Sequence, residues 1–187
     1  MDQDLVVRAQ QGDQVAFARL VDAVYGRFQQ LAFRILRDRE LARDATQQAT
    51  VSMWRKLPQL RDPARFEAWA YRTLVNECYT ESKRRRRSLP AVAQDGVREP
   101  SVEAQYGSVA DRDQLERAFG HITLDQRVAL VMRHYLGLPI DAIAETLGVP
   151  AGTVKSRLDR GLRGMRRALE ADARPGPGPV GSKEVVR

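Results

Sequence analysis

Apolar residues recur at every third or fourth position along almost the whole chain, and this spacing restricts its fold more than any other feature. One such stripe runs from Phe17 to Leu36, and a second, spaced by fours, runs from Leu41 to Leu57. A repeat of about 3.6 residues places these side chains on one face of an α-helix. No segment keeps the alternation that a half-buried strand needs. The chain is therefore predicted to be all-α.

Breaks in this periodicity divide the chain into two small helical domains. The first is expected over 1–87, where the last helix ends in a run of five cations. Periodicity fails over 88–110, which holds two prolines and two glycines and is typical of a flexible linker. The second domain is expected over 111–172. The remaining residues, 173–187, are rich in glycine and proline and are expected to form a disordered tail.

The second domain carries the pattern of a helix-turn-helix. A capping box that begins at Thr123 predicts a helix continuing to Tyr135. A short helix is expected over 140–147, and the next helix starts at Pro150 or Ala151. Two helices with a short glycine-containing turn between them are typical of this DNA-binding motif.

The last of these helices has an apolar and a basic face. The apolar seam predicted to be buried consists of Val154, Leu158, Leu162, Met165 and Leu169. The outer face near the helix N-terminus consists of Thr153, Lys155, Ser156, Arg157 and Arg160. In a helix-turn-helix this end enters the major groove, where arginine can pair with guanine while lysine, serine and threonine hold phosphates. A merely solvated basic face is the plainer alternative.

The stretch 61–87 mixes aromatic and basic side chains. Cations bind phosphates, and each aromatic ring that stacks on an unpaired base contributes about 1–3 kcal/mol. Unstacking duplex DNA costs about 1.4 kcal/mol per step, so a few such contacts can hold a short opened segment. Phe66 and Trp69 can equally belong to the core, and the run 83–87 can be a solvated helix end.

Charge and composition favour a polyanionic partner and exclude several classes of function. The chain has 31 Lys and Arg against 24 Asp and Glu, a net charge of +7, which suits nucleic acid or an acidic membrane surface. One cysteine and two histidines are too few for a zinc cluster, so no metal and no cofactor is expected. Without a nucleophile constellation, paired carboxylates or a phosphate-binding loop, neither enzymatic activity nor a small-molecule substrate is expected.

The same composition indicates where the protein works. Cys78 is the only cysteine, which suits a reducing compartment. No apolar run reaches the roughly 18 residues of a membrane span, and the N-terminus lacks the pattern of a signal peptide. A cytoplasmic protein without membrane insertion is expected.

A third surface lies opposite the apolar stripe of the helix over 41–57. It consists of Asp44, Gln47, Gln48, Val51 and Arg55, with Trp54 beside it. This face is polar but weakly charged, so it suits a protein partner better than DNA.

Together these segments resemble the extracytoplasmic-function (ECF) sigma factors, the small two-domain promoter-recognition subunits of bacterial RNA polymerase. The likeness spans about residues 4–170. RAQQGDQVAFARLV is similar to the opening helices of the family, DATQQATVSMWRKLPQL to its core-binding segment, and FEAWAYRTLVNECYTESKRRRR to the helix that recognises the minus-ten element. The sequence around GTVKSR is similar to the domain for the minus-thirty-five element. The resemblance implies a transcription initiation factor that binds core RNA polymerase and promotes promoter melting.

The resemblance also implies roles for individual residues. Contacts with the clamp helices of the largest polymerase subunits are implied for Asp44, Gln47 and Gln48, with Trp54 shaping the helix. Contacts with the minus-ten element, including a loop that captures a flipped base, are implied for Arg61, Arg65, Phe66, Asn76, Tyr79, Lys83 and Arg84. Contacts with the minus-thirty-five element are implied for Thr153, Lys155, Ser156, Arg157 and Arg160. An anti-sigma factor is a further partner expected of the family.

Two positions depart from the family pattern. Gln48 stands where an acid is usual, and Thr50 stands where phenylalanine is usual, so the core-binding helix has less charge and less apolar bulk.

Two alternatives to the sigma factor are a free-standing helix-turn-helix regulator that acts without polymerase, and a nucleic-acid enzyme. The regulator leaves the stretch 61–87 unexplained, and the enzyme would need acidic or nucleophilic residues converging with the basic ones.

Overall fold

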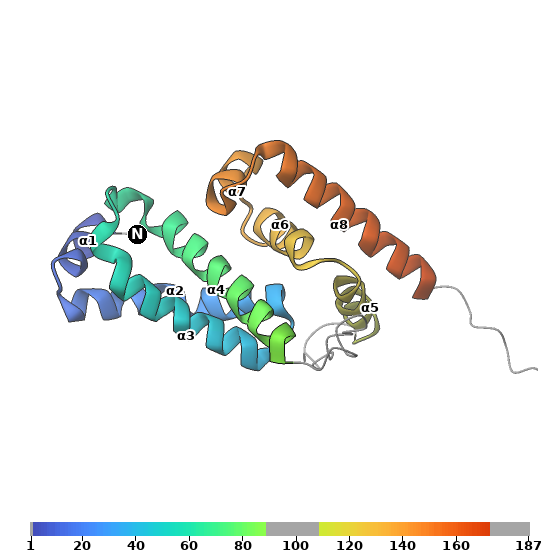
Figure 1. Cartoon of the computed structure of the whole chain (residues 1–187), viewed down its shortest axis with the longest axis horizontal. Coiled ribbons are helices and arrows are strands. Elements are labelled where there is room, and N and C mark those ends of the chain that lie inside the picture. The colour runs from blue at the N-terminus through green and yellow to red at the C-terminus, as the bar shows by residue number, and fades with distance from the viewer. Residues whose placement is uncertain (1, 89–108, 173–187) are drawn as a thin grey trace, which may run out of the picture.

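The computed structural model of the protein describes residues 2–88 and 109–172, and every regular element among them is helical (Figure 1). This confirms the predicted all-α class. Most of the predicted linker and the whole predicted tail lie outside the described residues. The helices are α1 (Gln3–Gln10), α2 (Gln14–Leu36), α3 (Arg39–Lys56), α4 (Phe66–Ser88), α5 (Val109–Gly120), α6 (Leu124–His134), α7 (Ile140–Leu147) and α8 (Ala151–Asp172). Two 3-10 turns, η1 (Leu57–Gln59) and η2 (Pro63–Arg65), connect α3 to α4.

The N-terminal lobe, residues 2–88, is built around α2, α3 and α4, which pack side by side (Figure 1). Acidic caps begin two of these helices: Asp13 accepts hydrogen bonds from the Val15 and Ala16 amides, and Asp38 accepts one from the Leu41 amide. Such caps satisfy amides that have no partner within the helix. The largest fully buried side chains in this lobe are Phe28, Phe66, Leu20, Leu31, Ile35, Met53, Leu57 and Leu74. The apolar stripes predicted from the sequence therefore form the core.

The C-terminal lobe, residues 109–172, contains α5 to α8, with α7 and α8 forming the helix-turn-helix. The capping box at Thr123 is present: its hydroxyl accepts from the Gln126 amide, and the Gln126 side chain accepts from the Thr123 amide. Gly148 ends α7 in the left-handed conformation, with a φ of 66°, which glycine adopts without a side-chain clash. The predicted helix boundaries here are confirmed to within one residue.

The predicted apolar seam of α8 is wrong at Leu162, whose side chain is 50% exposed. The buried stripe instead passes through Val154, Leu158, Gly161 and Met165. A Cβ at Gly161 would lie only 2.9 Å from Leu130 Cδ1 and 3.3 Å from Gln126 Cβ, so α8 packs tightly against α6 at this glycine. The next residue, Leu162, lies on the solvent side of this contact. Apolar periodicity could not show this, because glycine carries no side chain that a stripe would include.

A substitution at Gly161 tests this packing. We expect Gly161→Val to lower the free energy of unfolding by about 1–3 kcal/mol, because the branched side chain overpacks the contact with Leu130. Leu162→Ala, on the exposed side of the same turn, should cost less than about 1 kcal/mol. Urea unfolding followed by circular dichroism measures both. A larger loss at Leu162 than at Gly161 would restore the original seam.

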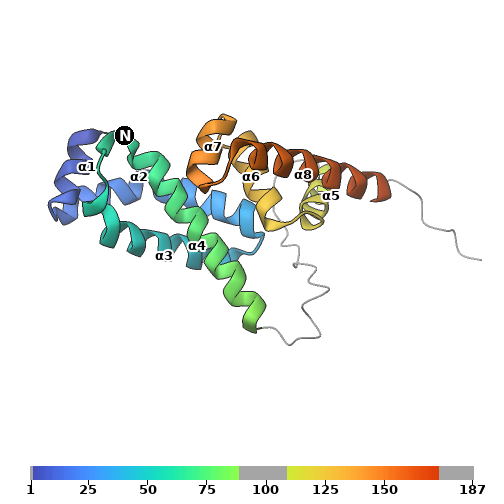
Figure 2. The same ribbon diagram turned by 45° about the horizontal axis from the view of Figure 1, so that its top comes forward.

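The two lobes pack directly against each other, which the linker pattern did not predict (Figures 1 and 2). In this interface α6 contacts α2, and α7 contacts α4. Arg127 of α6 is 3% exposed and donates from Nη1 to the Ile35 carbonyl at the end of α2, at 2.8 Å. The buried Arg37, which follows α2, forms an ion pair of 3.1 Å with Glu116 of α5.

Candidate nucleic-acid and protein interface

The outer face of α3 is open to solvent over the whole length predicted for a protein partner. Asp44, Gln47, Gln48 and Val51 are exposed, while Ala45, Ala49 and Met53 of the opposite face are buried. Trp54 is 40% exposed and holds its ring edge-on to Phe17, with the ring centroids 4.8 Å apart. With Arg55, which is also exposed, the face combines two amides, one carboxylate, one cation, one valine and a supported aromatic ring, a composition suited to docking a protein surface.

Thr50 fits its place beneath this face despite departing from the family pattern. Its hydroxyl donates to the Thr46 carbonyl one turn earlier, at 3.0 Å, and the Thr46 hydroxyl donates to the Ala42 carbonyl at 2.8 Å. Each half-buried or buried hydroxyl is thus satisfied within α3. The substitution removes apolar bulk without leaving a polar group unpaired.

The loop before α4 is shaped by Asp62, which accepts a hydrogen bond from the Ala64 amide as the cap of η2. Arg61 and Arg65 on either side are exposed, and Arg65 forms an ion pair with Glu145 of α7. Phe66 differs from both: it is 1% exposed and lies in the core, its ring centroid 6.0 Å from that of Trp69. No face of the Phe66 ring is free for a base, so the core alternative holds for this residue.

Further along α4, some of the side chains predicted to contact the minus-ten element are exposed, and one is hydrogen-bonded within the protein. Asn76, Lys83 and Arg84 are exposed. The Tyr79 hydroxyl donates to Asp125 Oδ1 of α6, at 2.7 Å. Burial, reinforced by the Asp125 carboxylate, raises the pKa of Tyr79 well above its usual value, so this hydroxyl stays a donor at neutral pH.

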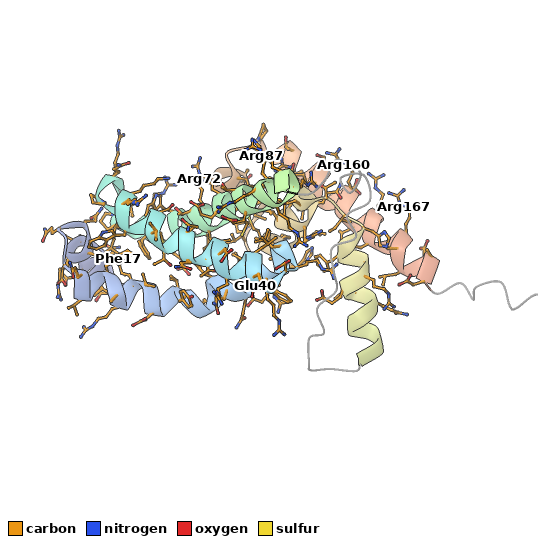
Figure 3. The ribbon with its side chains drawn as sticks, turned by 60° about the horizontal axis from the view of Figure 1, so that its bottom comes forward. Phe17, Glu40, Arg72, Arg87, Arg160 and Arg167 are labelled. Carbon is orange, nitrogen blue, oxygen red and sulfur yellow. The ribbon has the colours of Figure 1, made fainter. Side chains whose placement is uncertain are left out.

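Among the cations at the end of α4, Arg85 is held by the fold while its neighbours face outward. Arg85 forms an ion pair with Asp38, the cap of α3. Arg87, on the last turn, is exposed (Figure 3). The basic run is therefore not one uniform solvated end, since one of its members fastens α4 to the start of α3.

The start of α8 presents two fully outward cations and one turned inward. Lys155 and Arg160 are exposed, and Figure 3 shows Arg160 projecting from α8. Arg160 donates to the Ser156 carbonyl and to its hydroxyl oxygen, both at 3.1 Å, which holds the guanidinium along the helix. Arg157 is only 18% exposed and donates from Nη2 to Asp125 Oδ2 at 3.0 Å. Thr153, at the start of the helix, is half-buried.

Asp125 is the functional candidate that sequence reasoning missed, because it stands inside the capping box and was explained there as a helix start. Its two carboxylate oxygens join Tyr79 of one lobe to Arg157 of the other. Glu145, which pairs with Arg65, was missed for a different reason: an acid on a short helix gives no sign of a partner distant in the sequence.

An open cleft of about 840 Å³ lies between the lobes. Its wall is largely aromatic and aliphatic, with Trp69 and Tyr71 from α4 facing Leu136 and Leu138 from the loop between α6 and α7. Arg27, Arg65 and Arg72 add positive charge to it. An interface that borders such a cleft is packed less completely than a protein core. The two lobes are therefore in contact, but they do not share one continuous, fully packed core.

The described residues contain no group of His, Cys, Asp and Glu side chains that could hold a metal ion. Within the same ranges, no helix is both long enough and apolar enough to span a membrane. Cys78 is buried in α4, and burial raises the pKa of its thiol. This thiol is part of the core.

Comparison with known proteins gives the same two halves. A family model described as "Sigma-70 region 2" matches residues 20–88, and one described as "Sigma-70, region 4" matches residues 112–165. The RNA polymerase sigma-H factor of Pseudomonas aeruginosa is 31% identical over 183 residues, which cover 90% of this chain and 94% of that protein. The ECF RNA polymerase sigma factor SigM of Mycobacterium tuberculosis is 31% identical over 168 residues, covering 90% of this chain and 84% of SigM.

Solved structures show the same arrangement of helices. The sigma factor RpoE from Bartonella quintana, in complex with the anti-sigma factor NepR, matches with a TM-score of 0.67 and 27% identity, covering 83% of this chain and 98% of RpoE. CnrH, in complex with the cytosolic domain of CnrY, matches with a TM-score of 0.67 and 22% identity, covering 92% and 99%. The CnrH match supports the fold alone.

Proposed function

This chain belongs to the ECF sigma factors, and from that premise we propose that three of its surfaces divide the work of transcription initiation. As a sigma factor it binds core RNA polymerase and promoter DNA, and it initiates transcription. Sigma factors are not catalysts, so RNA synthesis belongs to the polymerase. The observation that carries the proposal is that the weakly charged face of α3, the exposed groups of α4 and the basic start of α8 lie on separate helices.

The proposed docking surface for core polymerase is the outer face of α3. Asp44, Gln47 and Gln48 would contact the clamp helices, with Trp54 shaping the edge of the patch. Support comes from their exposure and from the edge-on contact of Trp54 with Phe17, which orders the Trp54 ring before any partner arrives. A preordered side chain loses less entropy on binding. The low charge suits a protein better than DNA.

The proposed minus-ten surface runs from the loop before α4 to the end of that helix. Arg61 and Arg65 would frame the site of the flipped base, Asn76 and Tyr79 would face its neighbours, and Lys83 and Arg84 would hold phosphates. Phe66 is given a different role from the one implied by the resemblance: its buried ring supports the loop from below. Strand opening would follow from trapping unpaired bases against this surface.

The proposed minus-thirty-five surface is the start of α8. Lys155 and Arg160 are exposed there, so they would make the first phosphate or base contacts. Thr153 and Ser156 would add hydroxyl contacts, and Arg157 would contribute once it leaves Asp125. We propose domain limits of 1–87 and 111–172 for the two DNA-binding units. A helix N-terminus aimed at DNA also places its partial positive charge toward the phosphates.

Removing two cations from α8 tests the minus-thirty-five assignment. Lys155→Ala with Arg160→Ala should weaken holoenzyme binding to a promoter about 10- to 100-fold, and should lower the slope of log affinity against log salt by about 2. Arg166→Ala with Arg167→Ala is the control, because these exposed cations lie on the same helix beyond the proposed contact. Binding to core polymerase should stay unchanged in both variants. Equal losses in the two variants would contradict the assignment.

Two further proposals follow from the family. We propose that the protein works in the bacterial cytoplasm, where core polymerase and promoter DNA are found.

An anti-sigma factor is proposed as a regulatory partner, because the RpoE neighbour is seen in complex with one. Such a partner, copurified with the chain and added to purified holoenzyme, should inhibit promoter-specific transcription; a copurified protein with no effect would count against it.

A further inference from the structure

An acid stands among the basic side chains in the first half of α8. Asp159 is exposed between Lys155 and Arg160, the two cations that are proposed to meet the minus-thirty-five element. The other acids of α8, Glu170 and Asp172, lie in its last turn. A carboxylate on a surface that approaches DNA is repelled by the phosphates. Such a residue weakens binding to every sequence unless a hydrogen-bond donor on a base compensates for it.

Asp159 faces away from the protein, within the span of a major groove. The buried stripe of α8 passes through Val154, Leu158, Gly161 and Met165. The opposite strip, spaced by threes and fours, consists of Gly152, Ser156, Asp159 and Arg163. Asp159 lies about 12 Å along the axis from Ala151, the first residue of α8, and the major groove is about 12 Å wide. A helix that enters the groove by its N-terminal end therefore carries Asp159 to the base edges.

The Asp159 carboxylate is held at one oxygen and open at the other. Oδ2 forms an ion pair with Arg163 Nη2, one turn further along the helix. The described residues provide no hydrogen-bond donor to Oδ1. The adjacent guanidinium of Arg160 is turned to Ser156 instead, where it donates to the carbonyl and to the hydroxyl oxygen. Asp159 therefore presents one oriented acceptor on a surface that is otherwise dominated by cations.

The stability of α8 does not account for this arrangement. The side chains of Asp159 and Arg163 are 62% and 65% exposed, and exposed ion pairs of this spacing stabilise a helix only slightly. The pair also takes positive charge away from a surface that is proposed to bind phosphates. A contact between Asp159 and a base would compensate for this loss.

The major-groove edges of the four bases decide which contact this is. Guanine offers only the acceptors N7 and O6 there, and thymine offers the acceptor O4 and a methyl group, so both disfavour a carboxylate. Adenine offers its N6 amino group beside the acceptor N7, a combination that suits an amide rather than a carboxylate. Cytosine offers its N4 amino group, a donor with no acceptor of its own beside it. An aspartate on the reading helix therefore favours cytosine.

We propose that Asp159 selects a cytosine at one position of the minus-thirty-five element, with Oδ1 accepting a hydrogen bond from the N4 amino group of the base. Arg163 is a positioning residue: it holds Oδ2, and its charge offsets the repulsion between the carboxylate and nearby phosphates. The inference rests on the proposed function, because it takes from it that the start of α8 lies on the minus-thirty-five element.

The first test compares the bases that the holoenzyme selects. Core polymerase carrying the wild type or a variant is bound to promoters in which the minus-thirty-five element is randomised, and the bound DNA is sequenced. The wild type should prefer cytosine about 10-fold at one position, as expected for one charge-assisted hydrogen bond to a base. Asp159→Ala should lose this preference, and Asp159→Asn should shift it to adenine, which pairs with an amide. Preferences at the other positions should stay within about twofold of the wild type.

Glu170→Gln is the matched control for Asp159→Asn. It also replaces an exposed acid of α8 by its amide, about three turns further along the same side of the helix and outside the proposed contact. Its selected sequences should equal those of the wild type. A cytosine preference that persists in both Asp159 variants would overturn the proposal. A uniform gain in the affinity of Asp159→Ala for all sequences would also overturn it, because repulsion alone predicts that result.

The second test separates positioning by Arg163 from direct reading. Arg163→Gln should lower the cytosine preference about threefold at the same base pair, because the carboxylate loses the partner of Oδ2. Arg163→Lys, which keeps a cation for Asp159, should retain the preference. Both variants should keep the helix content of the wild type in circular dichroism, since the side chain is exposed. A changed preference at a different base pair would mean that Arg163 reads DNA itself, and would overturn its positioning role.

Failure of the proposed function would give a different result. If α8 does not lie on the minus-thirty-five element, the variant with Lys155→Ala and Arg160→Ala will bind promoters like the wild type. If only the role of Asp159 is wrong, that variant will lose promoter binding, while Asp159→Asn selects the same sequences as the wild type.

Discussion

Asp44→Arg combined with Gln48→Arg should reduce promoter-specific transcription at least about 100-fold. Both residues lie on the exposed face of α3, where a docked polymerase would desolvate two new charges without providing partners for them. Like or unpaired charges at such a contact cost several kcal/mol, and about 1.4 kcal/mol is a factor of ten in affinity. The loss should be seen in the binding of labelled core polymerase as well as in run-off transcription, since docking precedes every later step.

A matched variant separates docking from a general effect of charge. Asp22→Arg with Gln29→Arg makes the same change, one acid and one glutamine to arginine, at exposed positions of α2. It should leave core binding within about threefold of the wild type. If both variants lose binding equally, the α3 face is not the specific docking surface. If neither does, Asp44 and Gln48 lie outside it.

Phe66→Ala should destabilise the protein by about 3–5 kcal/mol, the cost of truncating a large aromatic side chain in a core. This is a large share of the roughly 5–15 kcal/mol that stabilises a typical domain. Transcription at elevated temperature should fall with the folded fraction. Thermal and urea unfolding measure the loss directly. A loss of transcription by a variant as stable as the wild type would contradict the buried role.

Phe66→Leu distinguishes a core residue from a base-stacking one. Leucine keeps apolar volume in the core but has no ring to stack on a base. If Phe66 supports the loop from below, the variant should lose no more than about 1.5 kcal/mol of stability and keep promoter opening. If the ring captures the base, Phe66→Leu should remain folded but lower the fraction of opened promoter by about tenfold or more. Permanganate reactivity of promoter thymines measures opening.

The helix boundaries and helix faces of this protein were largely predictable from its sequence. The boundaries of α6 and α7 follow from Thr123 and Gly148, because a capping box and a left-handed glycine are satisfied by neighbours within four residues. The face of α3 that carries Asp44, Gln47 and Gln48 followed from a spacing of three and four residues, and all three are exposed. Such features depend on short-range geometry alone.

Contacts between residues distant in the sequence were not predictable in the same way. Asp125 serves its own helix start, so nothing in its neighbourhood indicates that Tyr79 and Arg157 both reach it. Phe66 could be assigned to the core or to DNA with equal reason until the packing around it was known. Leu162 was misplaced because α8 packs against α6 through Gly161, and a glycine adds no apolar side chain to the pattern from which the seam was predicted.

The central claim, that this chain initiates transcription only together with core polymerase, is tested most directly by run-off transcription. Templates with randomised promoter regions are incubated with purified core polymerase alone, with this protein alone, and with both. We expect transcripts from a selected promoter set only when both are present, and the selected sequences should share two conserved elements about two DNA turns apart. Specific duplex binding by the protein alone, with no polymerase-dependent transcript, would contradict the account and favour a free-standing regulator.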